Sequence, residues 1–462
     1  MALTFDATGL FGDGKDARLT RAEFAAALPR AAVVRDRHLA NLPAWRTLHA
    51  RREHLDASLR RAEEVKQRHA PEVFVVLGIG GSALGSEALA AALAPVYQEW
   101  RPSPGQPRLF VLDNVDPDWL GEFFDAIPAD RMHVNVISKS GGTLETSAQF
   151  LLAWERVRRA VSSDAEARER FTITTDPAGG HYRALCERQG FATLPVPAGV
   201  GGRFSVLSPV GLFTAAMGGM DCASLLEGAA KTDARLRAAT PDADPALAYA
   251  LAHVLYLERG KPGHVHFVYS HKARLLADWY QQLWAESLGK KRDEQGRKVH
   301  VGPTPLKAIG PTDQHSQIQL FVEGPDDKVY TFLKLDKFGR ELAVPEPFAD
   351  SPAFAPLPGR SFQELMQAER EGTEIALEQA GRPVCRIELC KLDAFHLGAY
   401  FLFFEVATAL AGHMLGIDPY DQPGVEAGKK NALALMNAPG FEAHALALRG
   451  AIARRQVVRL TC

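Results

Sequence analysis

An α/β fold of two lobes, each built on a parallel sheet covered by helices, is predicted from three features of the sequence. The chain has 462 residues, which exceeds one typical domain. From Val73 onward, short apolar segments alternate with longer amphipathic ones, as is typical of parallel strands linked by helices. A strand, a Ser/Gly loop and a helix follow one another twice, over residues 73–89 and 265–288. This repetition indicates two related lobes.

The first lobe is expected to hold five short strands. Each is an apolar run bounded by Gly, Pro, Ser or Asp, and amphipathic segments lie between several of them. We predict strands at 73–77, 109–112, 134–137, 171–174 and 192–196, and helices at 84–94, 147–160 and 182–189.

The second lobe repeats this pattern after a helical stretch at 209–257. We predict strands at 265–269, 317–323 and 329–335, and helices at 273–288, 364–379, 394–415 and 425–436. The predicted division of the chain is a helical N-terminal extension at 1–60, a first lobe at 61–215, a second lobe at 216–440 and a helical C-terminal tail at 441–462.

Composition argues against several classes of partner. The 53 Lys+Arg residues nearly balance the 55 Asp+Glu residues, and no basic stripe is interleaved with aromatic residues, so nucleic acid is not an expected partner. No apolar run of about 18 residues and no secretory leader is evident, so we expect neither a membrane span nor export. The cysteines match no zinc spacing and fit a reduced cytoplasm: Cys186, Cys222, Cys385, Cys390 and Cys462.

The loop at 138–143, Ser-Lys-Ser-Gly-Gly-Thr, has the composition of a phosphate site. It follows an apolar strand and precedes a helix, so hydroxyls, backbone N–H groups and a helix N-terminus come together. A simple helix cap would explain one hydroxyl but neither the two glycines nor Lys139. No ATP-type P-loop is present, so a small phosphorylated metabolite is the favoured ligand.

A second loop, Gly-Ile-Gly-Gly-Ser-Ala at 78–83, follows the first predicted strand. It satisfies the dinucleotide-binding pattern, but the nearest strand-end acid, Asp113, is about 30 residues on, where about 20 is expected. A plain turn is one alternative. A sugar-binding loop is favoured, because ligands bind where neighbouring parallel strands end.

Four side chains further along are candidates for proton transfer or charge stabilisation. Glu286 and Gln282 share one face of a predicted helix, although Glu286 could instead be a solvated partner of Lys290. Arg203, in Gly-Gly-Arg-Phe-Ser, suits stabilisation of an oxyanion or an ordinary salt bridge. His315 lies in a polar turn ahead of a predicted strand.

Lys429 lies in Gln-Pro-Gly-Val-Glu-Ala-Gly-Lys, which is not a nucleotide-binding loop. A solvated lysine is its simplest interpretation. His264 and His266 alternate on one strand face, and we interpret them as structural because no third metal ligand has a recognisable spacing.

Taken together, these segments resemble the glucose-6-phosphate isomerase family, in its bacterial form. They occur in the family order over about 350 residues: G-I-G-G-S at 78–82, S-K-S-G-G-T-L-E-T at 138–146, G-G-R-F-S at 201–205, W-A-E-S-L-G-K at 284–290, T-D-Q-H-S-Q at 312–317 and Q-P-G-V-E-A-G-K at 422–429. The resemblance implies two sugar-isomerase (SIS) lobes with the ligand between them.

The resemblance also implies an activity, the reversible conversion of glucose 6-phosphate to fructose 6-phosphate through a cis-enediol(ate), in glycolysis and gluconeogenesis. Glu286 would carry the proton between C1 and C2, and Arg203 would stabilise the intermediate. His315 and Lys429 would move protons during ring opening. Such a reaction needs no metal or redox cofactor, and we expect none.

The binding residues and the assembly are implied in the same way. The family forms a homodimer in which a second subunit donates the histidine, here His315. The residues expected to contact phosphate or sugar are Gly80, Gly81, Ser82, Ser138, the Lys139 backbone, Ser140, Thr143, Gln282 and Gln422.

Three other functions are weighed against this one. A non-catalytic SIS sensor would keep the two loops but would not need Glu286, His315, Arg203 and Lys429 together. Another SIS enzyme could act on mannose 6-phosphate or an amino sugar. A nicotinamide-dependent dehydrogenase rests only on the weak glycine pattern at 78–83.

Overall fold

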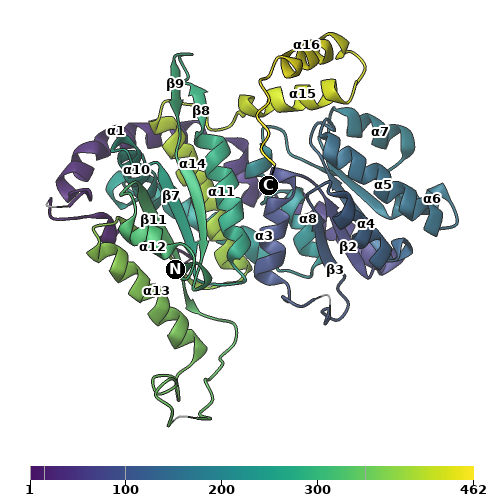
Figure 1. Ribbon diagram of the computed structural model, residues 1–462. Coiled ribbons are helices and arrows are strands. Elements are labelled where there is room, and N and C mark those ends of the chain that lie inside the picture. The colour runs from purple at the N-terminus through teal and green to yellow at the C-terminus, as the bar shows by residue number, and fades with distance from the viewer. Residues whose placement is uncertain (1, 15, 99, 349, 462) are drawn as a thin grey trace.

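The computed structural model describes residues 2–14, 16–98, 100–348 and 350–461. Two five-stranded sheets lie side by side with helices packed around them (Figure 1). The predicted α/β class with two lobes is therefore confirmed.

The first sheet has the strand order β3-β2-β4-β5-β6, and all neighbouring strands are parallel. On β2, Val73, Val75 and Leu77 belong to one apolar cluster, whereas Phe74 and Val76 belong to another. Both faces of the sheet are thus covered, as the unbroken apolar strands predict. The elements of this lobe are β2 (Val73–Leu77), α3 (Leu84–Leu93), β3 (Arg108–Leu112), α4 (Pro117–Ala126), β4 (Met132–Ile137), α5 (Leu144–Ala160), α6 (Asp164–Glu169), β5 (Phe171–Thr175), α7 (His181–Gln189) and β6 (Ala192–Pro195).

The second sheet has the order β1-β12-β11-β7-β10. Four of its strands are parallel, and the N-terminal strand β1 pairs antiparallel with β12 at one edge. The start of the chain thereby joins the second lobe. The elements are β1 (Thr4–Asp6), β7 (Gly263–Val268), α11 (Arg274–Leu288), the hairpin β8 (Lys290–Arg292) and β9 (Lys298–Val301), β10 (Thr304–Ile309), α12 (Ile318–Glu323), β11 (Lys328–Lys337), α13 (Phe362–Gln379) and β12 (Val384–Lys391).

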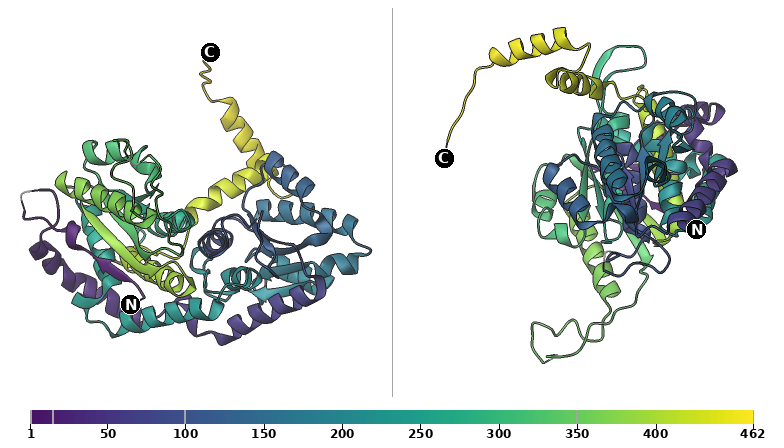
Figure 2. Two further views of the ribbon diagram at one scale, coloured as in Figure 1. Left: turned by 90° about the horizontal axis from the view of Figure 1, so that it is seen from below. Right: turned by 90° about the vertical axis from the view of Figure 1, so that its right-hand side faces the viewer.

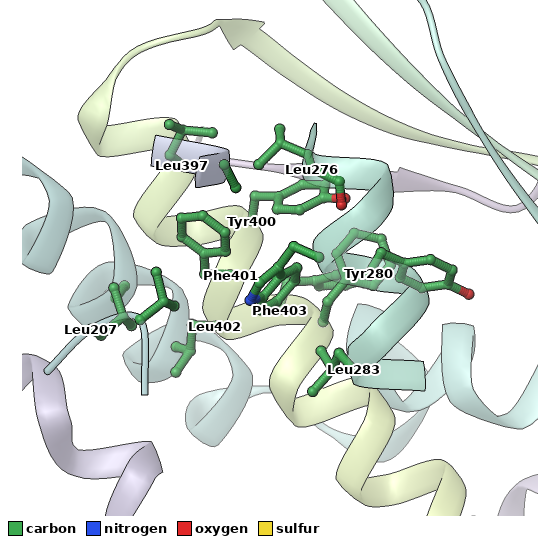
Figure 3. Close-up of a cluster of buried hydrophobic side chains, with 14 of the residues drawn as sticks. Leu207, Leu276, Tyr280, Leu283, Leu397, Tyr400, Phe401, Leu402 and Phe403 are labelled. Atoms are coloured by element: carbon green, nitrogen blue, oxygen red, sulfur yellow. The ribbon is translucent and has the colours of Figure 1, made fainter. Parts of the chain in front are cut away.

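Helix α14 forms the centre of a core that connects the two sheets. It packs against α9, α10 and α11, and Figure 3 shows its aromatic side chains beside Tyr280 and Leu283 of α11. By length and composition α14 could cross a membrane, contrary to the expectation of no such segment, but 94% of its apolar window is buried inside the fold. It is therefore a core helix. Helix α14 itself spans Ala394–Met414, and the other long helices of the two lobes are α1 (Arg21–Ala40), α2 (Arg52–His69), α8 (Pro209–Met217), α9 (Cys222–Ala238) and α10 (Pro245–Glu258).

The C-terminal helices α15 (Glu426–Leu435) and α16 (Glu442–Ala453) form an arm that projects from the two lobes (Figure 2). They pack mainly on each other. Leu435, Met436 and Leu446 are largely exposed there, at 52%, 70% and 76%.

One predicted strand is wrong. Residues 317–323 were expected to form a strand because a short apolar run follows a polar turn, but the structure has helix α12 over Ile318–Glu323. Ile318, Phe321 and Val322 have helical spacing, and all three pack against the second lobe's apolar cluster. Two strands of the second sheet were not predicted. In β10, Pro305 and Lys307 interrupt the apolar pattern, and β1 lies in the N-terminal stretch at 1–60 that was expected to be helical.

Candidate active site

Two loops that contain Ser and Gly follow the carboxyl ends of neighbouring strands in the first sheet. Strand β2 pairs in parallel with β4, with Leu77 opposite Val136, so the loops that follow them begin side by side. The first contains the 3-10 turn Gly80–Ser82, and the second is the loop at 138–143. The predicted juxtaposition of these loops is confirmed.

Glycine is required at two positions of the first loop. Gly80 has a φ of +57°, and a Cβ atom there would lie 2.8 Å from Nε2 of Gln282. A Cβ atom on Gly81 would lie 2.4 Å from the carbonyl carbon of Gly202 and 2.6 Å from the backbone nitrogen of Arg203. The backbone of this loop therefore touches the segments that carry Gln282 and Arg203.

The loop at 138–143 presents hydroxyls at the start of α5. Oγ of Ser138 accepts a hydrogen bond from the Gly141 N–H, and Oγ of Ser140 accepts one from the Gly142 N–H, both at 3.2 Å. Both hydroxyl protons thus remain available to a ligand. Thr143 is the N-cap residue of α5 but makes no side-chain capping bond, so the alternative of a simple cap does not describe it.

Lys139 connects this loop to the next one. Its ammonium group donates to the carbonyl oxygen of Val200 at 3.1 Å, close to the glycines that precede Arg203. The side chain therefore braces the segment that positions Arg203.

Arg203 is buried, and its guanidinium group is held on several sides. Its Nε donates to Oγ of Ser287 at 2.7 Å, and its Nη2 donates to the carbonyl oxygens of Pro419 and Asp421 at 2.7 and 3.0 Å. Its Nη1 donates to Oε1 of Gln422. Burial lowers the pKa of Arg203, while the neighbouring acids, Glu286 first, oppose this.

Glu286 lies beside this arginine on α11. Its carboxylate is 3.5 Å from Nη1 of Arg203 and accepts a hydrogen bond from Nε2 of Gln282 at 3.1 Å. The side chain is 31% exposed, so it is reachable from the surface. The alternative partner, Lys290, donates instead to the backbone carbonyl oxygens of Glu286 and Ser287.

These contacts unite part of the predicted site. Gly80, Gly81, Arg203, Gln282, Glu286 and Gln422 form one connected cluster, and Lys139 reaches its edge. The cluster brings together the carboxylate of Glu286, the guanidinium group of Arg203 and the backbone of Gly80 and Gly81. Of these groups, the Glu286 side chain is partly exposed at the surface.

Two predicted residues lie apart from this cluster. His315 is exposed at the end of the short turn after β10, and its imidazole makes no hydrogen bond or ion pair within the described chain. Lys429 is on the C-terminal arm, where its ammonium group pairs with Glu426 at 3.0 Å.

Sequence reasoning missed the residues that hold Arg203 in place. Ser287 and the backbone carbonyls of Pro419 and Asp421 bind its guanidinium group, while Lys290 links α11 to Asp421. The position of Ser287 next to Glu286 was a usable signal. The identity of a residue, however, does not show whether its backbone carbonyl will bind a side chain.

The histidines of β7, His264 and His266, are buried and hydrogen-bond to neighbouring aromatic side chains. Nε1 of Trp284 donates to Nδ1 of His264 at 2.9 Å, and the hydroxyl of Tyr400 is 2.7 Å from Nε2 of His266. Within the described residues no cluster of three metal-binding side chains is present. The four cysteines described there are free, and Cys462 lies outside the described residues.

Comparison with known proteins decides the family of the chain. The family model described as phosphoglucose isomerase matches residues 66–445. The chain belongs to the phosphoglucose isomerase family.

Relatives and solved structures agree with this family. A glucose-6-phosphate isomerase from Rubrobacter xylanophilus is 42% identical over 87% of this chain and 90% of its own. A hypothetical protein from Thermus thermophilus superposes with a TM-score of 0.83 at 34% identity, covering 95% of this chain and all of that one. A glucose-6-phosphate isomerase from Chlamydia trachomatis gives a TM-score of 0.72 at 25% identity, over 86% of this chain and 76% of that one. Family membership supports the sequence-based prediction of an isomerase, whereas the sensor and dehydrogenase alternatives gain no support.

Proposed function

We propose that this protein interconverts D-glucose 6-phosphate and D-fructose 6-phosphate. The observation that carries the proposal is the placement of the Glu286 carboxylate beside the buried Arg203 and the backbone of Gly80 and Gly81. Family membership adds the substrate, because the matched relatives are named glucose-6-phosphate isomerase.

Glu286 is the proposed base. The reaction moves one proton between two neighbouring carbons, so one carboxylate that faces both carbons can remove and return it. Gln282 donates to this carboxylate and so fixes its orientation. The intermediate carries negative charge on oxygen, and Arg203, held by Ser287 and two backbone carbonyls, is a preorganised cation for it.

The loop at 138–143 is the proposed phosphate anchor. Ser138 and Ser140 use their oxygens to accept backbone bonds and retain their hydroxyl protons, and Thr143 has no capping bond. Backbone N–H groups at the start of α5 add the favourable end of the helix dipole. Binding the phosphate here holds the sugar while the reaction occurs at C1 and C2.

His315 and Lys429 are proposed to serve ring opening in a homodimer, with His315 donated to the partner's site. His315 is exposed at the surface, and Lys429 lies on an arm that leaves Leu435, Met436 and Leu446 exposed. Short helices are rarely stable alone in water, and exposed apolar side chains favour packing on another chain. The free thiols fit the cytoplasm, where we place the reaction.

The first experiment is a coupled assay with glucose 6-phosphate, fructose 6-phosphate and mannose 6-phosphate, using wild type, Glu286→Gln and the control Glu122→Gln on the exposed surface of α4. Wild type and the control are expected to isomerise glucose 6-phosphate. Glu286→Gln is expected to lose about 10²–10⁴-fold in kcat, because loss of a general base costs that much, while still binding the sugar phosphate. An inactive wild type would contradict the proposed function. An active Glu286→Gln variant would contradict only the assignment of the base.

A further inference from the structure

A cavity with several charged side chains in its wall lies at the amino ends of strands in the first sheet, opposite the candidate active site. Its volume is about 380 Å³, and its walls come from the end of α2, from α6 and from the residues leading into β6. Strand β6 begins at this cavity, whereas the loop at 138–143 follows the far end of β4. Figure 1 shows α6 at the outer end of this lobe, away from α11. The two sites are therefore separated by the length of the sheet.

Arginines outnumber carboxylates around this cavity. Arg61 pairs with Glu64 and Arg68 pairs with Glu169, each at 3.3 Å, and the two carboxylates are about half exposed. Arg168 lines the cavity and has no partner within the described part of the chain. Arg170, just beyond, approaches Glu166 only at 3.5 Å, and its Nε and Nη1 are buried without a hydrogen-bond acceptor.

His69 contributes a polar side chain to the cavity wall. Its side chain is only 9% exposed, and its Nε2 is shielded from water without a hydrogen bond. The nearest carboxylate oxygen, on Glu169, is 3.7 Å away. Burial lowers the pKa of His69, and the positive charge of Arg170 lowers it further. A buried polar atom without a partner costs free energy, so this position favours a ligand that hydrogen-bonds to Nε2; with the ring proton on Nε2, or with the ring protonated, that ligand is an acceptor such as a phosphate oxygen.

Arg61 is already fixed for such a ligand. Its Nε donates to Oγ1 of Thr172 at 2.9 Å and its Nη2 donates to the carbonyl oxygen of Phe171 at 3.3 Å. Its guanidinium group is therefore held against the sheet and loses little conformational entropy when an anion arrives.

We propose that this cavity is a second anion site, which binds a phosphate group through His69, Arg168 and Arg61. Phosphate matches the unpaired donors because it offers several strong acceptor oxygens and two negative charges. The volume is at the lower end of small-molecule sites, so the group can be free phosphate or the phosphate of a small metabolite. The site is separate from the isomerase site and does not depend on the proposed function.

Histidine-selective NMR of the full-length protein tests this directly, with the His69 signal assigned through His69→Asn. Inorganic phosphate is expected to raise the pKa of His69 saturably by about 1 pH unit, because a nearby anion favours the charged imidazole. Sodium chloride at the same ionic strength is the control for screening. Glycerol 3-phosphate is the second ligand: tighter binding than phosphate identifies a phosphorylated metabolite, and weaker binding identifies free phosphate.

The matched variants are Arg168→Gln and Arg60→Gln, the latter on the exposed face of α2 outside the cavity. Arg168→Gln is expected to weaken the phosphate response of His69 at least tenfold, whereas Arg60→Gln keeps it. Both should retain wild-type isomerase kinetics. The proposal is overturned if phosphate leaves His69 unchanged, if chloride has the same effect, or if the two variants respond alike.

Discussion

Arg203 brings together more of the candidate site than any other side chain described above. Ser287, Gln422 and the carbonyl oxygens of Pro419 and Asp421 take up its donors, and Glu286 lies next to it. The planar guanidinium group has five N–H donors and can serve all of these acceptors at once, whereas the ammonium group of a lysine has only three donors at one point.

We expect Arg203→Lys to lower kcat at least about 10²-fold, because loss of a donor to a developing oxyanion costs about 10²–10³. Steady-state kinetics at saturating substrate measures this. Arg188→Lys, on the exposed face of α7, is the control and should behave like wild type. Equal kinetics for both variants would mean that Arg203 is only a structural residue.

A second residue-scale prediction concerns Glu87, at the start of α3. Burial first, and then the charges of Asp113 and Asp278, raise the pKa of Glu87 to about 7. Because the folded-state pKa lies above the value of 4.5 for the free side chain, Glu87 favours folding at low pH, and this contribution is lost as the pH rises through 7.

Glu87→Gln removes that titration. Compared with wild type, the variant should gain up to about 3 kcal/mol in the free energy of unfolding between pH 4.5 and pH 8.5, at about 1.4 kcal/mol per pKa unit. Urea unfolding at several pH values measures it. Glu122→Gln should show no such pH-dependent gain, and a pH-independent difference for Glu87→Gln would refute the shift.

At the scale of elements, the close approach of two short turns decides the geometry of the site. The turn Gly80–Ser82 contacts the turn Gly202–Phe204, and no space is left for a side chain at Gly81.

Gly81→Ala is therefore expected to push the backbone of Arg203 away and to lower kcat/KM about 10–100-fold, since a displacement of about 1 Å at a site can cost 10²-fold. Gly121→Ala, in α4 with open space at its Cβ position, is the control and should raise stability by roughly 0.5–1 kcal/mol. Normal kinetics in Gly81→Ala would show that this contact can relax.

Sequence patterns predicted most elements because their apolar runs are long and their loops contain clear turn residues. All five strands of the first sheet and helices α3, α5 and α11 lie where expected, within a few residues. Helix α12 and strands β1 and β10 were not predicted. The six residues of α12 are too few to separate helical from strand periodicity, β1 has only three residues, and the edge strand β10 exposes Thr304 and Lys307. Of the site, the acid, the arginine and both loops were predicted, but the carbonyls around Arg203 depend on the folded chain.

At the scale of the whole molecule, the C-terminal arm projects from the two lobes and His315 is exposed on the surface. The arm carries Lys429 and exposes Leu446 and Met436, so a second copy is its proposed partner. The domain limits proposed from the sequence, after residues 60, 215 and 440, stay predictions.

Mixed dimers test whether the site is shared. If His315 acts in the partner's site, a dimer of one Glu286→Gln and one His315→Ala subunit contains one complete site and one doubly altered site. Unfolding and refolding an equal mixture should then restore about a quarter of wild-type activity, as expected for random twofold pairing. Activity no higher than that of the two separate variants would contradict the shared site. A wild-type protein that is active but monomeric by light scattering would also contradict it.

Proton exchange at the reacting carbons is the most direct test of the central claim that Glu286 moves a proton between C1 and C2. Fructose 6-phosphate is incubated with the enzyme in D₂O, and NMR follows deuterium entering C1 of that sugar and C2 of glucose 6-phosphate. The wild type is expected to incorporate deuterium at both carbons, and Glu286→Gln is expected to bind the sugar with no measurable incorporation. Incorporation by Glu286→Gln at the wild-type rate would contradict the mechanism.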